Sequence, residues 1–256
     1  MEMLERTEML LGRSAVERLG RAHVAVFGAG GVGGHAIEAL VRSGVGEITI
    51  VDMDTVSVSN INRQVFATTK TVGMAKVEAA ELRIHEICPD CVVHGLRLRY
   101  LPEVEFDFTK FDYVIDAIDT VAGKVAIAER CTAAGVPVIS AMGAGNKLDP
   151  TRFVVTDIYK TSVCPLAAVM RRELRKRGVP RLKVVYSTEV ALKPLFQPED
   201  EEIEGENGVS GADAPVKRRA TPASSAFVPS VCGLIIAGEV VRELSGVGLD
   251  GSGRDE

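Results

Sequence analysis

The sequence predicts an α/β fold of the doubly wound type, with a mostly parallel sheet, helices on both faces and a smaller C-terminal extension. Short runs of Val, Ile and Ala alternate with longer segments that carry apolar residues at helical spacing. The glycine-rich stretch GAGGVGG at 28–34 directly follows one such run. An acidic residue then ends the next apolar run, about twenty positions further on. Together these three observations predict a nucleotide-binding α/β domain.

The first part of the chain contains five expected strands and three expected helices. The strands are predicted at His23–Phe27, Glu47–Val51, Cys91–Leu98, Tyr113–Ala117 and Val136–Ser140. The helices between them are predicted at Val32–Arg42, Gly73–Ile87 and Val121–Ala134. Apolar strands that alternate with helices indicate a parallel sheet that is covered on both faces.

After the glycine-rich break at Gly143–Asp149, the pattern changes. Two further strands are expected at Arg152–Asp157 and Leu182–Tyr186, with a helix at Leu166–Lys176 and a closing helix at Val231–Leu244. Residues from about 196 to 221 are acidic, then rich in Gly and Ala, then basic, so we expect a mobile loop there. Residues 246–256 are expected to be a tail.

Composition limits the functional classes. The chain has 256 residues, 46% of them apolar and 25% charged, as in ordinary globular proteins. The net charge of −5 provides no overall attraction to nucleic acid or to anionic membranes, so such a contact would need a local basic patch. No basic-then-apolar leader and no long apolar run is present, which predicts a cytoplasmic protein with no membrane partner.

The five cysteines are scattered and odd in number, so we expect free thiols. Cys88 and Cys91 have CxxC spacing, but a structural zinc site commonly needs a second such pair, and the chain has none. We therefore expect no structural zinc, with metal or redox use of this pair as the alternative. Cys232 lies in the apolar run VCGLIIAG, where a buried thiol is favoured over a nucleophile; Cys164 is the other candidate nucleophile.

The glycine loop fits the GxGxxG pattern of Rossmann-like folds through Gly28, Gly30 and Gly33. These positions allow a tight turn, a close approach of backbone to phosphate, and close packing of helix against strand. A phosphate would then lie at the helix N-terminus. Asp52 follows the next strand, where a carboxylate can bind ribose hydroxyls. The alternative is a bare doubly wound domain with a surface aspartate.

The residues downstream favour a nucleoside triphosphate with Mg²⁺ over a dinucleotide. A polar cluster, then a lysine, then two carboxylates follow the loop: Asn60, Asn62, Arg63 and Gln64; Lys76; Asp116 and Asp119. Cations can neutralise phosphates while a carboxylate holds the metal ion. We expect Arg63 and Lys76 to be exposed pocket charges. The alternatives are a solvated helix face for Lys76, a surface loop charge for Arg63 and a helix N-cap for Asp119.

The motifs GxGGxG (28–33), DxDxVxxSNxxRQ (52–64), GxxK (73–76) and DAxD (116–119) resemble those of the ubiquitin-activating-type, ThiF-like adenylating superfamily over about residues 6–160. The resemblance implies that Asp52 binds ribose, that Arg63 and Lys76 bind ATP phosphates, and that Asp119 holds Mg²⁺. It implies that the rest of the pocket is formed by Gly28, Gly30, Gly31, Gly33, Asp54, Asn60 and Gln64. It also implies a homodimer in which Arg6 reaches into the ATP site of the partner subunit.

Positive charge gathers in the C-terminal part. One group lies on the expected helix and one in the expected loop: Arg171, Arg172, Arg175 and Lys176; Lys217, Arg218 and Arg219. Such a stripe can contact a phosphate backbone, and the alternative is a solvated helix face. The acidic run at 199–206 does not fit a neighbouring surface that binds RNA.

Four further stretches resemble one branch of the superfamily, the bacterial tRNA threonylcarbamoyladenosine dehydratases: RTEMLLG (6–12), GAGNKLDPT (143–151), KTSVCPLAA (160–168) and VVYSTE (184–189). The resemblance implies ATP-dependent adenylation of the carboxylate of threonylcarbamoyladenosine in tRNA, followed by closure to a hydantoin-type ring. Residues 1–160 would be the ATP-binding adenylating core and 161–245 a region that faces tRNA.

Three other functions stay open from the sequence. One is adenylation of the C-terminus of a ubiquitin-like sulfur-carrier protein, with a cysteine-desulfurase system as a possible partner. Another is a non-catalytic nucleotide-binding scaffold for a sulfur-transfer partner, and an NAD oxidoreductase comes last. A monovalent cation is a further possible cofactor.

Overall fold

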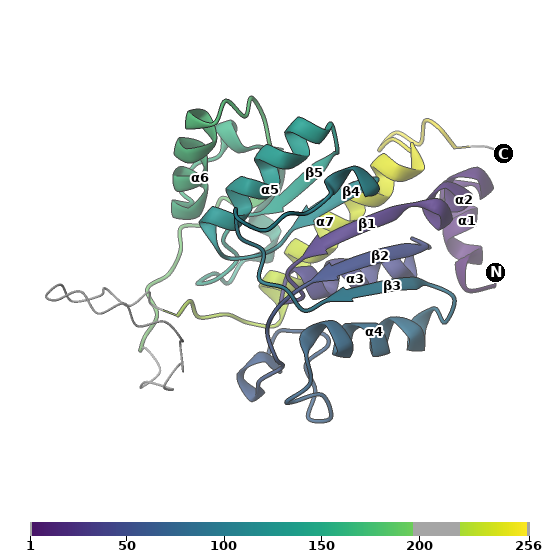
Figure 1. The fold of residues 1–256 in the computed structure, drawn as a ribbon, viewed down its shortest axis with the longest axis horizontal. Coiled ribbons are helices and arrows are strands. Elements are labelled where there is room, and N and C mark those ends of the chain that lie inside the picture. Colours follow the sequence, from purple (N-terminus) through teal and green to yellow (C-terminus); the bar gives the residue numbers. More distant parts are fainter. Residues whose placement is uncertain (1, 197–220, 255–256) are drawn as a thin grey trace, which may run out of the picture.

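The computed structural model describes residues 2–196 and 221–254. A seven-stranded sheet in the order β3-β2-β1-β4-β5-β7-β6 forms its centre, with helices on both faces (Figure 1). The predicted fold class, a mostly parallel doubly wound sheet, is confirmed. The predicted mobile loop and its acidic run lie outside the described residues, apart from the two ends of the loop.

Five strands of the first part are parallel: β1 (His23–Phe27), β2 (Glu47–Val51), β3 (Val92–Leu96), β4 (Tyr113–Asp116) and β5 (Val138–Ala141). In the C-terminal part, β7 (Lys183–Ser187) pairs in parallel with β5, and β6 (Phe153–Asp157) is antiparallel to β7. β3 is shorter than predicted. Leu98 leaves the strand because its N–H turns back to the carbonyl of Leu96, 2.9 Å away.

The helices are α1 (Glu5–Leu11), α2 (Arg13–Arg21), α3 (Gly33–Arg42), α4 (Lys76–Ile87), α5 (Val121–Ala134), α6 (Pro165–Lys176) and α7 (Phe227–Ser245). α4 begins three residues later than predicted. Gly73 has a φ of +88° and donates its N–H to the carbonyl of Val56, so the residues before Lys76 close a loop and do not start the helix. α7 is longer than predicted at its start, where Pro229 is tolerated in the first turn.

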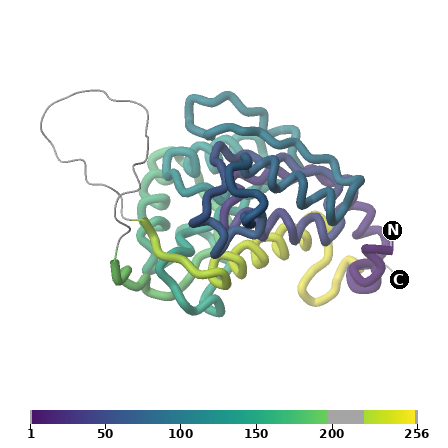
Figure 2. The backbone as a smooth tube through the Cα atoms, turned by 90° about the horizontal axis from the view of Figure 1, so that it is seen from below, coloured from purple at the N-terminus to yellow at the C-terminus, as the bar shows by residue number. Residues whose placement is uncertain are grey.

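Alternate residues of β1 are buried in two different layers. Val24 and Val26 belong to the cluster that contains α3 and α7, whereas Ala25 and Phe27 belong to the cluster that contains α5. Figure 2 shows α7 running beside α3. Gly233 allows this approach, because a Cβ there would lie 2.3 Å from the carbonyl oxygen of Val32. The C-terminal helix therefore covers the sheet that carries the glycine loop.

None of the helices in the described ranges combines the length and the apolar composition that a membrane span requires.

Candidate functional site

The glycine loop joins the carboxyl end of β1 to the start of α3. Gly28 donates its N–H to the carbonyl of Val51 at 2.8 Å and has a φ of +93°. A Cβ on Gly28 would lie 2.8 Å from the carbonyl oxygen of Ala117, at the end of β4, and one on Gly33 would lie 1.7 Å from the carbonyl oxygen of Gly28. The loop is therefore packed so tightly that these positions require glycine.

Replacement of Gly33 by alanine is expected to distort the loop and to abolish nucleotide binding. Its Cβ cannot be accommodated 1.7 Å from a backbone oxygen unless the turn moves. The matched control is Gly238→Ala on α7, where a Cβ meets no atom within 4 Å and a gain of about 0.5–1 kcal/mol in unfolding free energy is expected. Calorimetric ATP titration and urea unfolding measure both effects, and wild-type ATP affinity in Gly33→Ala would contradict this account of the loop.

Asp52 lies directly after β2 and closes one side of the loop. Its carboxylate accepts the N–H of Ala29 at 2.7 Å and the N–H of Asp54 at 2.8 Å. Burial raises the pKa of Asp52 above its ordinary value, and the nearby Lys76 opposes that shift. The carboxylate is thus fixed to the backbone of the glycine loop itself, in the position predicted for a ribose-binding acid.

Lys76 begins α4, and its Nζ lies 2.6 Å from Oδ2 of Asp54 and 4.0 Å from Oδ1 of Asp52. Only 7% of the residue is exposed, so the prediction of an exposed charge is wrong for this lysine. The reason is local pairing: the Lys76 N–H bonds to the carbonyl of Asp54, and Thr55 bridges to Ala75. This pairing turns the side chain inward toward both carboxylates.

The polar cluster after β2 is ordered by its own hydrogen bonds. The Asn60 side chain accepts the N–H of Ser57 at 3.2 Å and closes a short 3₁₀ turn. The guanidinium of Arg63 donates to the carbonyl of Ser59 and to Oδ1 of Asn62, both at 2.8 Å. Arg63 is partly exposed, which leaves N–H groups that can bind an anion.

This cluster lies over the glycine loop. Gln64 is buried, and its Nε2 lies 3.9 Å from the position that a Cβ on Gly30 would occupy. Cγ of Arg63 lies 3.4 Å from the corresponding position on Gly31. The structure therefore brings Arg63 and Gln64 to the loop, as the sequence predicted.

Asp119 is exposed in the segment between β4 and α5, two residues after Ala117, which contacts Gly28. Within residues 2–196 and 221–254 its carboxylate has no hydrogen bond or ion pair, and Thr120 occupies the N-cap position of α5. Such a carboxylate beside the loop suits Mg²⁺, which prefers oxygen ligands and binds through one or two carboxylates together with nucleotide phosphates.

Arg6 is the one predicted catalytic residue that a single chain does not bring to this site. It is exposed on α1, and α2 ends just before the amino end of β1. The glycine loop follows the carboxyl end of the same strand, so α1 and α2 lie at the opposite end of the sheet (Figure 1).

Sequence reasoning missed a buried ion pair behind the site. Nζ of Lys124, on α5, lies 3.0 Å from Oδ2 of Asp116, and both residues are fully buried. Ser140 donates to the same oxygen at 2.6 Å, and Lys124 also donates to the carbonyl of Ile118 at 3.2 Å. Oδ1 of Asp116 has no partner among the described atoms. The sequence signal for this buried pair is a lysine inside the apolar run GKVAIA.

The cysteines are free thiols. Burial raises the pKa of the Cys232 thiol to about 12 and that of the Cys91 thiol to about 11, so neither is a thiolate at neutral pH. The interpretation of Cys232 as a buried apolar thiol is confirmed. Cys164 is also buried, at the start of α6.

The basic residues of α6 differ in their surroundings. Nη1 of Arg171 donates to the backbone carbonyl and to the hydroxyl of Thr161, and this side chain is half-buried. Arg175 lies over the ring of Tyr159, 5.1 Å from its centroid. Arg172 and Lys176 each donate to Glu173 at 3.1 Å and are exposed. Lys217, Arg218 and Arg219 lie outside the described residues.

The chain is similar to known proteins over most of its length. The ThiF family matches residues 4–254 of the chain. A tRNA threonylcarbamoyladenosine dehydratase of Bacillus subtilis is 43% identical over 248 residues, which cover 95% of each protein. The protein of that name in Escherichia coli is 39% identical over 198 residues, covering 73% of this chain and 74% of that protein.

Solved structures show the same similarity. The E. coli tRNA N6-threonylcarbamoyladenosine dehydratase in complex with ATP superimposes with a TM-score of 0.79 at 32% identity, covering 96% of this chain and 94% of that one. The complex of that protein with AMP gives a TM-score of 0.81, also at 32% identity, covering 94% and 93%.

Proposed function

Because this chain belongs to the ThiF family, we propose that it is an adenylating enzyme that uses ATP to dehydrate threonylcarbamoyladenosine in tRNA. The observation that carries the proposal is the arrangement around the glycine loop. Arg63, Lys76 and Asp119, whose carboxylate has no partner among the described residues, lie around this loop. The similar E. coli dehydratase has been solved in complex with ATP. ATP and tRNA are the substrates in this proposal.

In the first step, a carboxylate oxygen of the substrate attacks the α-phosphorus of ATP, the bond to the bridging oxygen breaks, and pyrophosphate leaves. Asp52 binds the ribose, and Arg63 and Lys76 neutralise the phosphate oxygens. Asp119 would hold Mg²⁺, which supplies further neutralisation of the phosphates. The carboxylate is already ionised at neutral pH, so the step needs no general base.

In the second step, a nitrogen of the same substrate attacks the activated carbonyl carbon. The nitrogen loses its proton, the ring closes, and AMP leaves with the carboxylate oxygen, so that one water is lost overall. The nucleophile belongs to the substrate and acts at high effective molarity. The high pKa of the buried Cys232 thiol suits a route that needs no enzyme cysteine.

The position of Arg6 supports a homodimer. Since α1 lies at the opposite end of the sheet from the loop of its own chain, Arg6 could serve only the ATP site of a partner subunit. We also propose that the protein acts in the cytoplasm, which fits a tRNA substrate.

Nucleoside mass spectrometry tests the substrate. tRNA from a strain that lacks this gene is expected to retain threonylcarbamoyladenosine and to lack its cyclic form. Purified protein with Mg²⁺ and ATP should convert that tRNA with the loss of one water. An unchanged cyclic nucleoside in the deletion strain would refute the substrate. Pyrophosphate exchange that depends on a small protein ending in Gly-Gly, and not on tRNA, would favour the sulfur-carrier alternative.

The exposed cations of α6 are proposed to contact tRNA phosphates. The triple variant Arg172→Ala/Arg175→Ala/Lys176→Ala is expected to weaken tRNA binding and to reduce the slope of log K against log salt by about 2–3, because each lost phosphate contact removes about 0.7–0.9 of slope. Fluorescence anisotropy at several salt concentrations measures this. Arg21→Ala on α2, where the side chain is also exposed, is the control. If the triple variant keeps the wild-type salt dependence of tRNA binding, these cations of α6 face solvent and do not contact tRNA.

A further inference from the structure

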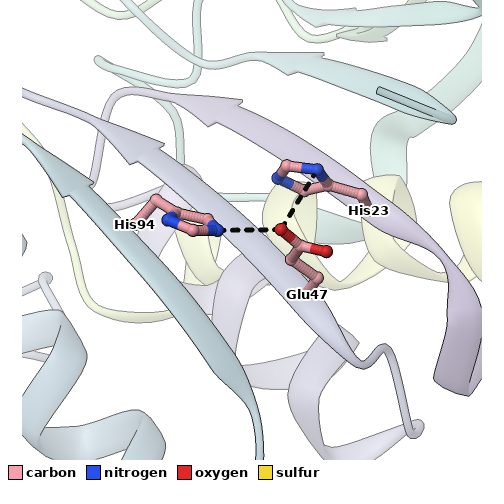
Figure 3. A group of neighbouring side chains, drawn as sticks. All are labelled: His23, Glu47 and His94. Atoms are coloured by element: carbon pink, nitrogen blue, oxygen red, sulfur yellow. Dashed lines mark hydrogen bonds and ion pairs between the residues drawn. The ribbon is translucent and has the colours of Figure 1, made fainter. Parts of the chain in front are cut away.

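We propose that His23, Glu47 and His94 bind a divalent transition-metal ion such as Zn²⁺, at the end of the sheet opposite the glycine loop. Figure 3 shows the three side chains turned toward one another from adjacent strands. His23 is the first residue of β1 and Glu47 the first of β2, whereas His94 lies in the middle of β3. Nothing in the adenylation chemistry uses these residues.

The strand register places the three side chains on one face. His23 pairs with Glu47, and Thr49 pairs with His94. Side chains of residues paired across parallel strands point to the same face, and so do those of Glu47 and Thr49, which are two positions apart. The cluster therefore follows from the fold, although its members are far apart in sequence.

The distances suit a metal ion. Oε1 of Glu47 lies 2.8 Å from Nε2 of His94 and 3.5 Å from Nδ1 of His23. The three potential ligand atoms all lie within 4.8 Å of one another. In a tetrahedral zinc site with bonds of about 2.0–2.1 Å, ligand atoms are about 3.3 Å apart. The observed separations bracket this value, so an ion can bind after small rotations of the side chains.

The surroundings orient the ligands. Nε2 of His23 lies 2.8 Å from the hydroxyl of Thr49, and the ring of Phe111 packs edge-on at a centroid distance of 4.7 Å. A hydrogen bond to one ring nitrogen fixes a metal-binding histidine and leaves the other nitrogen for the metal. Nδ1 of His23 is the nitrogen that faces Glu47.

Glu47 has an unusual set of partners. In the part of the chain that the structure describes, its carboxylate lies within 4.0 Å of the two histidines, and no Lys or Arg lies within that distance. Neutral imidazoles are metal ligands, so this carboxylate and two imidazoles form a two-nitrogen, one-oxygen ligand set. His94 is exposed, which gives an ion access and leaves coordination positions for water.

This site is distinct from the proposed Mg²⁺ site at Asp119. Gly28 follows His23 by five positions, which is roughly 16 Å along an extended strand. Imidazole ligands suit Zn²⁺, Co²⁺, Ni²⁺ and Cu²⁺, whereas Mg²⁺ prefers oxygen. The site also differs from the cysteine-based zinc site that the sequence argues against. A bound ion would join β3, β2 and β1 at the exposed edge of the sheet and stabilise them.

The test uses the full-length protein without a histidine tag. Titration with Zn²⁺ against a chromophoric chelator, and with Co²⁺ followed by visible absorption, is expected to show one equivalent bound per chain. Glu47→Gln and His94→Asn should each weaken binding at least 100-fold. His85→Asn, which removes an exposed histidine outside the cluster, should bind like the wild type. At zinc concentrations about 100 times Kd, the wild-type Tm should rise by roughly 5–10 °C, and that of His94→Asn should not.

The proposal is overturned if the wild type binds no stoichiometric Zn²⁺ or Co²⁺, or if His94→Asn and Glu47→Gln bind as tightly as the wild type. His94 is exposed, so its substitution is expected to leave the fold intact, and circular dichroism verifies this. The result with His94→Asn therefore decides the question even if Glu47→Gln does not fold.

Discussion

Replacement of Lys76 by alanine is expected to lower the rate of ATP-dependent adenylation about 10²–10³-fold, the usual effect of removing one preorganised charge from a transition state. The ammonium of Lys76 is buried beside the loop, held 2.6 Å from Asp54 and 4.0 Å from Asp52. A buried, oriented charge stabilises developing phosphate charge more than a solvated one does, because the surrounding dielectric is lower. The burial that contradicted our prediction therefore strengthens the expected role.

Single-turnover release of pyrophosphate, at saturating ATP and tRNA, measures the effect. The matched control is Lys70→Ala, which removes an exposed lysine from the loop that precedes α4. Because backbone N–H groups of Ala29 and Asp54 still bond Asp52, the variant should fold, with unfolding free energy lower by about 1–3 kcal/mol. A folded Lys76→Ala protein that releases pyrophosphate within twofold of the wild-type rate would exclude this lysine from catalysis.

The features that sequence predicted well are local ones. GxGxxG and the acid after the next strand depend on short segments whose backbone must turn sharply, and the structure places Gly28, Gly33 and Asp52 as expected. Strands β1, β2 and β4 could be predicted because a strand that is buried on both faces appears in the sequence as a continuous apolar run. β3 lies at the sheet edge and is mostly exposed, so its apolar pattern gave a less accurate boundary.

Features that arise from contacts between distant segments could not be predicted in the same way. Lys76 is buried because residues 54–56 pair with residues 73–76, and no helical periodicity encodes that pairing. His23, Glu47 and His94 meet only through strand register. On α6, the spacing of Arg171 and Arg175 predicted that both would lie on one exposed basic face. Arg171 instead donates a hydrogen bond to the carbonyl of Thr161, which precedes the helix.

Replacement of Lys124 by methionine is expected to reduce the free energy of unfolding by about 3–5 kcal/mol, the usual effect of removing one partner from a buried ion pair. Lys124 and Asp116 are both fully buried, and without the ammonium the carboxylate retains one donor among the described residues, the hydroxyl of Ser140. Methionine keeps most of the side-chain volume, so the change isolates the charge from the packing. Urea unfolding followed by circular dichroism measures the loss.

Lys110→Met, at a lysine whose side chain is 70% exposed, is the control and should change stability by less than about 1 kcal/mol. The double variant Lys124→Met/Asp116→Asn should recover part of the loss, because no uncompensated charge then remains buried. A change below about 1 kcal/mol in Lys124→Met would show that the pair is not what stabilises this region. Asp116 immediately precedes Ala117, whose carbonyl oxygen would lie 2.8 Å from a Cβ on Gly28, so we also expect weaker ATP binding in the variant. We therefore expect the buried pair to couple the packing of α5 to the shape of the glycine loop.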